Sequence, residues 1–385
     1  MKVEFYKHPL GAEEIASLTE VVNSTFLTSG PKTKLFEAEF ASMMGMGYAT
    51  GVTSWTMGGF IALKALEIGE GDEVITTPMT FMATGNIIIE AGATPVFVDV
   101  EPDTGNISCD EIEAAITSRT KAILPVHLYG QMCDMRRMQE IARKHKIAII
   151  EDAAHCIEGV RDGIKPGQAS DMAVFSFYAT KNLASGEGGA IVTNDKSLND
   201  KLMVLRQHGM NKSAADRYSA RFKHYDMETL GYKCNMFDLQ AAMLLPQMPR
   251  LGERLARREY ICQRYENGFR GVEGISFPVV LDNSISARHL FTIWVDPEIR
   301  DEVLNDLQDR GIGVAVNFRS INRLTYYKEH FNMPDGTFPN AERIGDSTIT
   351  LPLYTKLTDE EIDYVIAQTI ESVQKVSSEV AVAVV

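Results

Sequence analysis

Short runs rich in Val, Ile and Phe alternate with helical stretches from about residue 72 to residue 190, and this alternation constrains the fold more than any other feature of the sequence. The pattern predicts an α/β fold with a mainly parallel sheet flanked by helices. Between two runs, Met135, Met138 and Ile141 recur at helical spacing, as in the surface helix of a βαβ unit. The predicted strands are Glu73–Thr76, Thr94–Val100, Ala122–Leu128, Ile147–Glu151, Met172–Phe177 and Gly189–Thr193.

The pattern of predicted strands and helices changes after about Pro249. A charged helix predicted over 251–268 leads into a mixture of strands, helices and turns that ends near Val373. Typical domain sizes divide a chain of 385 residues into about two units. We therefore expect a large domain over 1–249, including an N-terminal arm, and a smaller α+β C-terminal domain over 250–385.

Charge and composition exclude several classes of partner. The 38 basic and 52 acidic residues give a formal net charge of -14, which opposes attraction to nucleic acid or to an anionic membrane. The N-terminus lacks the apolar segment of a secretory signal, and no stretch is apolar for the roughly 18 residues that cross a bilayer. The five cysteines are scattered, and the histidines form no metal-spaced cluster. We expect a cytoplasmic protein without disulfides, a metal site, or a nucleic-acid or membrane partner.

Two residues follow predicted strands closely enough to share a site. Asp152 comes directly after the run 147–151, and Lys181 lies shortly after the run 172–177. Ligands of open α/β sheets bind beyond the carboxyl ends of the strands, so both side chains are expected in one crevice. An enzyme that uses pyridoxal 5′-phosphate (PLP) needs this pair, because the amine forms a Schiff base with the cofactor and the carboxylate keeps its pyridine nitrogen protonated. The alternative is a helix-capping Asp152 and a solvated Lys181.

A cluster of hydroxyl residues predicts an anion site. Thr53, Ser54 and Thr56 precede an apolar helix predicted over 57–66. Their hydroxyls and the first free backbone amides can hold an anion such as phosphate at the helix N-terminus, or they can form an ordinary helix cap. The Gly-rich segment 186–189 precedes a strand rather than a helix, so it is not a dinucleotide-binding motif.

Several motifs, in order along the chain, give the sequence a specific resemblance. They include Phe26-Leu27-Thr28-Ser29-Gly30-Pro31, Gly71-Asp72-Glu73-Val74-Ile75, Glu151-Asp152-Ala153-Ala154-His155, Phe175-Ser176-Phe177-Tyr178-Ala179-Thr180-Lys181-Asn182, Gly231-Tyr232-Lys233-Cys234-Asn235 and Leu351-Pro352-Leu353-Tyr354. With these motifs the chain resembles the DegT/DnrJ/EryC1/StrS family of sugar aminotransferases over nearly its whole length. The resemblance implies the fold type I architecture of PLP-dependent transferases, with PLP as cofactor.

The resemblance also implies roles for individual residues. Lys181 and Asp152 would be the catalytic pair, with Lys181 bound to PLP and Asp152 beside the pyridine nitrogen. His155 would lie near the ring hydroxyl, and Phe81 would stack on the ring. The phosphate would be held by Ser54, Thr56, the backbone of Met57, Ser176 and Asn235. Asn235 would reach it from the partner subunit, which implies a homodimer with shared active sites.

The substrates are likewise implied by the resemblance. The amino donor would be L-glutamate, which leaves as 2-oxoglutarate, and the acceptor would be a nucleotide-linked keto sugar. Arg319 suits a sugar phosphate or a carboxylate, and a surface ion pair is the alternative for this residue. The residues expected at the substrate are Ser29, Lys233, Asn317, Arg319 and Asn322.

Two other functions remain open at the level of the sequence. Related sugar 3-dehydratases use pyridoxamine phosphate on the same fold, but they replace the lysine with histidine, whereas this chain keeps Lys181. A non-catalytic sugar-binding regulator could also retain the fold. Such a binder has no need of a Schiff-base lysine together with Asp152 and His155.

Overall fold

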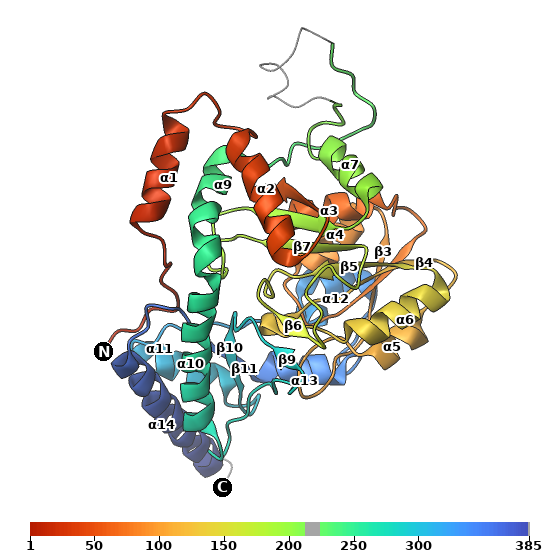
Figure 1. The fold of residues 1–385 in the computed structure, drawn as a ribbon. Coiled ribbons are helices and arrows are strands. Elements are labelled where there is room, and N and C mark those ends of the chain that lie inside the picture. The colour runs from red at the N-terminus through yellow and green to blue at the C-terminus, as the bar shows by residue number, and fades with distance from the viewer. Residues whose placement is uncertain (212–223, 384–385) are drawn as a thin grey trace.

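The computed structural model describes residues 1–211 and 224–383, and a seven-stranded sheet lies at its centre (Figure 1). The strand order is β1-β8-β7-β5-β4-β2-β3. Strand β8 runs antiparallel to both of its neighbours, whereas the remaining pairs in the sheet are parallel. The strands are β1 (Tyr48–Val52), β2 (Glu73–Thr76), β3 (Thr94–Phe97), β4 (Thr120–Leu124), β5 (Ala148–Asp152), β7 (Met172–Ser176) and β8 (Gly189–Thr193).

All six predicted strands are present in this sheet, with some ends shifted by a few residues. Strand β1 was not predicted, because its sequence Tyr-Ala-Thr-Gly-Val lacks a run of branched residues. The direction of β8 follows from its connection to β7 through residues 177–188, which contain no helix. Parallel neighbours usually need a helical crossover, so this short return produces an antiparallel pair.

Helices cover both faces of the sheet, and successive strand residues alternate between the two covers. In β7, Met172 and Val174 belong to the core beneath α3, α4 and α7, whereas Ala173 and Phe175 belong to the core beneath α2 and α9. Helices α5 and α6 cover the other half of this second face. Burial on both sides explains the continuous apolar strand runs. These helices are α2 (Pro31–Met44), α3 (Trp55–Ala65), α4 (Ala83–Glu90), α5 (Cys109–Ala115), α6 (Met135–His145), α7 (Lys196–Leu205) and α9 (Asp238–Leu244).

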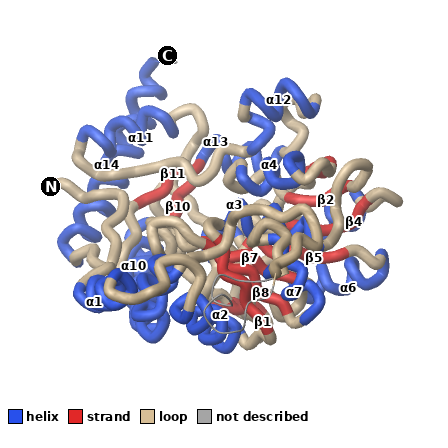
Figure 2. Tube along the Cα trace, turned by 90° about the horizontal axis from the view of Figure 1, so that it is seen from above, coloured by secondary structure: helices blue, strands red, loops and turns tan. Residues whose placement is uncertain are grey.

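A second core lies around the long helix α10 (Leu251–Phe269), which Figure 1 shows running from α9 toward α14. Its small sheet, β10 with β11, lies apart from the seven-stranded sheet when seen from above (Figure 2). Val3 of the N-terminal arm is 1% exposed and packs into this core beside Ile312. The remaining elements are α1 (Ala12–Val22), β6 (Val160–Arg161), β9 (Ser284–Ile285), β10 (Phe291–Trp294), α11 (Arg300–Asp309), α12 (Thr325–Phe331), α13 (Pro339–Ser347), β11 (Thr348–Leu351) and α14 (Asp359–Ala383).

The C-terminal end differs from the prediction. The predicted strands, helices and turns of the second domain end near Val373, but α14 continues to Ala383, and Val376 is 3% exposed within the second core. Val380, about one turn later, packs against the same core, so tertiary packing supports the helix beyond Val373. Within 1–211 and 224–383, we find no helix that combines the length and the apolar character needed to cross a membrane.

Candidate functional site

The carboxyl ends of β5 and β7 open onto one cavity of about 500 Å³, a size typical of small-molecule sites. Asp152, the last residue of β5, lines this cavity and is 5% exposed. Its Oδ1 accepts a hydrogen bond from the backbone amide of Ala154 (3.1 Å), and its Oδ2 accepts one from the Thr84 hydroxyl (3.0 Å). Burial raises the pKa of Asp152 to about 6, and the two hydrogen bonds oppose this shift. A cation bound beside Asp152 would therefore favour its ionised form.

Lys181 lines the same cavity from the connection between β7 and β8. Its backbone amide donates to the Tyr178 carbonyl (2.9 Å) and closes a turn. Its Nζ lies 3.4 Å from Nε2 of His289. Burial lowers the pKa of Lys181 to about 8, and the negative charge of Asp152 opposes the shift. A larger share of the amine is therefore neutral near pH 7 than in a solvated lysine, and only the neutral amine acts as a nucleophile or base.

His155 forms part of the cavity wall and is 7% exposed. Its ring centroid lies 4.4 Å from that of His289 and 5.8 Å from that of Phe318. Burial lowers the pKa of His155 well below its usual value, so the ring is neutral. Its buried Nδ1 has no hydrogen-bond partner among the described residues. A ligand atom in the cavity could satisfy this nitrogen.

The N-terminus of α3 reaches the cavity through Ser54, Trp55 and Thr56. Ser54 caps the helix, and its Oγ accepts a hydrogen bond from the Met57 amide (3.2 Å). The first amides of a helix lack partners within it, and the helix dipole favours an anion at this end. Met57 itself does not line the cavity, because its side chain packs on the core and its amide is used by the cap.

Gly189, the first residue of β8, packs directly against this helix N-terminus. A Cβ at position 189 would lie 2.7 Å from the carbonyl carbon of Ser54 and 2.8 Å from the Trp55 nitrogen, which forces the backbone apart. We expect Gly189→Ala to lower the free energy of unfolding by about 1–3 kcal/mol, measured by chemical denaturation. Gly252→Ala in α10, where a Cβ meets nothing within 4 Å, should instead raise it by up to about 1 kcal/mol. Equal effects of the two substitutions would contradict this account.

Three further predicted residues lie at the cavity. Ser176 ends β7, and its Oγ accepts a hydrogen bond from the Tyr178 amide (3.3 Å). Phe81 is 54% exposed, and its ring centroid lies 6.0 Å from that of Phe318. Asn317 presents a buried Oδ1 that has no hydrogen-bond partner in the described part of the chain. An aromatic face and an open polar atom therefore border the same space.

Asn235, Lys233 and Ser29 lie together outside this cavity. The Asn235 amide donates to Ser29 Oγ (2.8 Å) and accepts from Lys233 Nζ (2.6 Å). The backbone of this segment pairs with the end of β1, where Asn235 bridges to Val52. Within one chain, these three residues form a separate cluster that does not touch the space between Asp152 and Lys181.

Asn322, which is also expected at the substrate, lies in the interior of the protein. This side chain is 0% exposed, its Nδ2 donates to Glu342 Oε1 (2.8 Å), and its Oδ1 accepts from the Ser320 hydroxyl (2.6 Å). Both ends of the amide are used inside the protein, so Asn322 ties the short 3-10 helix η3 (Ile321–Arg323) to α13, and a substrate contact for it stays a prediction. Arg319, by contrast, is exposed next to the cavity residue Phe318, and we find no ion pair for it among the described residues.

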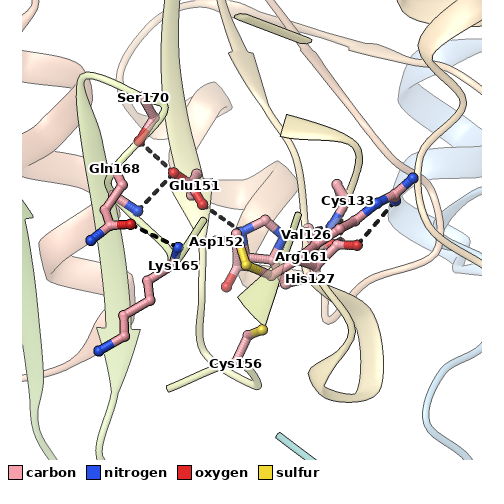
Figure 3. Close-up of polar contacts among 12 residues, drawn as sticks. Val126, His127, Cys133, Glu151, Asp152, Cys156, Arg161, Lys165, Gln168 and Ser170 are labelled. Atoms are coloured by element: carbon pink, nitrogen blue, oxygen red, sulfur yellow. Dashed lines mark hydrogen bonds and ion pairs between the residues drawn. The ribbon is translucent and has the colours of Figure 1, made fainter. Parts of the chain in front are cut away.

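A buried polar network lies behind Asp152 (Figure 3). Neighbouring residues of a strand face opposite sides, so Glu151 extends away from the cavity and is 0% exposed. Its Oε2 lies 2.6 Å from Nε2 of the fully buried His127, and its Oε1 accepts from the Gly167 amide (2.8 Å) and the Ser170 hydroxyl (2.5 Å). The His127 amide in turn donates to the Asp152 carbonyl (3.1 Å). The network therefore fixes the backbone that carries Asp152.

Sequence reasoning missed several residues of this site, chiefly His289, Thr84 and Phe318. His289 gives no signal in the sequence, since 108 residues separate it from Lys181 and no motif joins them. Thr84 lies three residues after Phe81, and a hydroxyl within an apolar helix could have been noticed as a partner for a buried acid. Phe318 carries no signal beyond its aromatic character.

Comparison with known proteins covers nearly the whole chain. Residues 9–370 match the model of the DegT/DnrJ/EryC1/StrS aminotransferase family. The spore coat polysaccharide biosynthesis protein SpsC of Bacillus subtilis is 45% identical over 368 residues, which are 94% of this chain and 95% of SpsC.

Solved structures of aminotransferases are also similar to this chain over nearly its whole length. Spr1654 from Streptococcus pneumoniae, assigned as a sugar aminotransferase and solved in its PLP-form, is 32% identical with a TM-score of 0.91, over 98% of this chain and 100% of that one. DesV from S. venezuelae, in complex with a ketimine intermediate, is 35% identical with a TM-score of 0.86, over 93% and 94%. The predicted fold type I architecture is confirmed.

Proposed function

This chain belongs to the DegT/DnrJ/EryC1/StrS aminotransferase family, and from that premise we propose that it transfers an amino group from L-glutamate to a keto group of a nucleotide-linked deoxysugar. The products would be 2-oxoglutarate and an amino sugar for glycan or antibiotic biosynthesis. PLP is the cofactor, in line with the PLP-form of a solved relative. One observation carries the proposal: the amine of Lys181 and the buried carboxylate of Asp152 line one cavity beside a helix N-terminus.

The polar groups of the cavity match those of PLP. Ser54 and the first turn of α3 suit a phosphate, and the Ser176 hydroxyl lines the same cavity. The unpaired Nδ1 of His155 suits the ring hydroxyl, and the exposed ring of Phe81 suits stacking on a flat π-system. Asp152 suits a protonated pyridine nitrogen, because a cation there would offset the cost of burying the carboxylate. These residues would hold the cofactor.

When bound, PLP supplies an aldehyde that takes up the amino group and a ring that accepts electrons from the broken C–H bond. Lys181 would hold the aldehyde through its amine until the amino donor displaces it. The freed amine would then act as a base at the donor Cα and later return the proton. This role needs a neutral amine, and burial favours one by lowering the pKa of Lys181 to about 8.

Two residues at the cavity edge would contact the substrates. Asn317 offers a buried amide oxygen without a partner, which suits a sugar hydroxyl. Arg319 offers an exposed guanidinium beside Phe318, which suits a sugar phosphate or the donor carboxylate. Asn317 and Arg319 flank Phe318 on one segment, so they would contact neighbouring groups of the same ligand.

We also propose that the enzyme is a cytoplasmic homodimer with shared active sites. Asn235, Lys233 and Ser29 are polar residues clustered away from the cavity of their own chain. Asn235 would complete the phosphate site of a second copy, with Lys233 and Ser29 beside the substrate there. Several apolar side chains near this cluster are exposed, including Leu27, Leu230 and Phe237, which favours burial against another subunit.

Incubation of the PLP-loaded protein with L-glutamate and a panel of keto-sugar nucleotides tests the proposal. We expect one or more sugars to replace a keto oxygen with an amino group, detected by product mass, with 2-oxoglutarate formed in equal amount. A control lacking glutamate should give no aminated sugar. Loss of a sugar hydroxyl would indicate dehydration instead. No exchange with any keto sugar, despite bound cofactor, would contradict the proposal and favour a binding protein.

A further inference from the structure

His289 lies against the amine of Lys181 and is 5% exposed. Its Nε2 is 3.4 Å from Lys181 Nζ, and its Nδ1 is 3.2 Å from Oδ1 of Asn182. A neutral imidazole carries one proton on one of these two nitrogens, and the other nitrogen is an acceptor. The position of that proton decides what His289 can do for Lys181.

Asn182 determines the position of the proton. Its Nδ2 donates to Oε2 of Glu158 (2.8 Å) and to the carbonyl of Ala287 (2.9 Å). Neither partner can donate, because one is a carbonyl and the other is a carboxylate held in a buried ion pair with Arg258. The oxygen of the Asn182 amide therefore faces His289 and accepts from it. Nδ1 of His289 carries the proton, and Nε2 presents a lone pair to Lys181.

The charged and titratable groups around His289 keep its ring neutral. Burial lowers the pKa of His289 well below its usual value, and the positive charges of Lys181 and Arg258 and the ring of His155 act in the same direction. Two anions lie in the described surroundings: Asp152 lines the same cavity and acts on Lys181, and the charge of Glu158 is compensated by Arg258 and Asn182. His289 is therefore a fixed acceptor of a hydrogen bond from the lysine amine.

We propose that His289 is a positioning residue for Lys181, which accepts one N–H of the amine whenever that amine is not bound to the cofactor. A lysine side chain has four rotatable bonds, and anchoring one N–H restricts where the amine lone pair can lie. Misplacement of a reacting group by about 1 Å can cost on the order of 10²-fold in rate. The series of hydrogen bonds from Glu158 through Asn182 to His289 thus fixes the geometry of Lys181. This inference rests on the function proposed above.

The tautomer of His289 provides the first test, with the apoprotein and no cofactor. Long-range ¹H–¹⁵N correlation spectra of protein labelled with [¹⁵N]histidine distinguish Nδ1–H from Nε2–H imidazole. The signals of His289 are identified by their loss in His289→Asn. We expect the Nδ1–H tautomer at neutral pH. An Nε2–H tautomer or a doubly protonated ring would overturn the proposal, because neither accepts from Lys181.

The second test compares His289→Asn with His289→Gln. Both variants lose the aromatic ring, so they lose similar packing, but only the longer glutamine can place an oxygen near the former position of Nε2. The readout is the rate at which the absorbance band of bound PLP appears after PLP is added to the apoprotein. We expect His289→Asn to slow this step by roughly 10–100-fold and His289→Gln to restore most of the rate.

Thermal unfolding of both variants checks that they are folded to the same extent. Equal rates for both variants, whether slow or normal, would overturn the positioning role. The outcome is separable from that of the proposed function. If Lys181→Ala loses the band while His289→Asn captures PLP normally, only the role of His289 fails, and if Lys181→Ala keeps the band, the proposed function itself fails.

Discussion

Lys181→Ala is expected to abolish both the absorbance band of bound PLP and the transfer of amino groups. In the described part of the chain, Lys181 is the one lysine that lines the cavity, so no other amine there could hold the aldehyde. A positioned general acid–base alone contributes about 10²–10⁴-fold to a rate. Because the variant loses both this base and the covalent attachment of the cofactor, turnover should fall by at least about 10³-fold. Absorbance spectra and initial rates with L-glutamate measure the two effects.

Two further variants identify the cause of that loss. Lys181→Arg keeps a positive charge but cannot lose its proton, so it should lose the band and the activity as Lys181→Ala does. Lys144→Ala removes a surface lysine that pairs with Glu113, and it should leave both readouts unchanged because exposed ion pairs contribute little. A Lys181→Ala protein with its band intact would refute covalent attachment at this residue.

Much of the fold could be predicted because its strands are buried on both faces. In runs such as Ile147–Glu151 every residue except the last is apolar, and that signal located six of the seven strands of the central sheet. Strand β1 was not predicted because Gly51 is adapted to close packing rather than to a branched side chain, since a Cβ at position 51 would lie 3.0 Å from Met236 and 3.4 Å from Glu37 of α2. Local sequence also gave no sign that β8 runs antiparallel, since direction depends on how the chain returns.

Prediction of the site rested on one rule, that ligands of open α/β sheets bind beyond the carboxyl ends of the strands. Asp152 and Ser176 end adjacent parallel strands, so their meeting in one cavity follows from the strand pattern. Their chemical roles, and that of Lys181, stay predictions. Side chains from the C-terminal part of the chain could not be placed in this way. Asn317 reaches the cavity but Asn322, five residues later, is buried among its own neighbours, and the sequence does not distinguish the two.

Buried polar groups were the least predictable feature. Glu151 reads as an ordinary charged residue at the end of a strand, yet it is fully buried and satisfied by His127, Gly167 and Ser170. These partners come from different segments, so only the folded chain shows that the charge is compensated. The dependence of Lys181 on Asn182 and His289 is of the same kind, because it is a property of contacts between distant segments.

Asp152→Asn should leave the fold intact and lower turnover on the order of 10²–10³-fold, the range expected when one partner of a buried charge pair is lost. Asparagine has the same shape, so its oxygen can still accept from the Ala154 amide. Its amino group would face the Thr84 hydroxyl, which can turn to accept because Thr80 lies 2.8 Å away as its other partner. The band of bound PLP should persist, since Lys181 is unchanged. The loss would arise because a pyridine ring whose nitrogen is not protonated accepts electrons poorly.

Asp171→Asn is the matched control for this experiment. Asp171 directly precedes β7, at the end of this strand opposite to Ser176, and its Oδ2 accepts from the Ile149 amide (2.8 Å). Both substitutions remove one negative charge and leave an oxygen for one backbone amide, but only Asp152 lines the cavity. Asp171→Asn should therefore keep normal turnover. If Asp152→Asn is as active as Asp171→Asn, the carboxylate does not act on the ring nitrogen, because loss of the charge at the cavity then has no more effect than loss of a charge outside it.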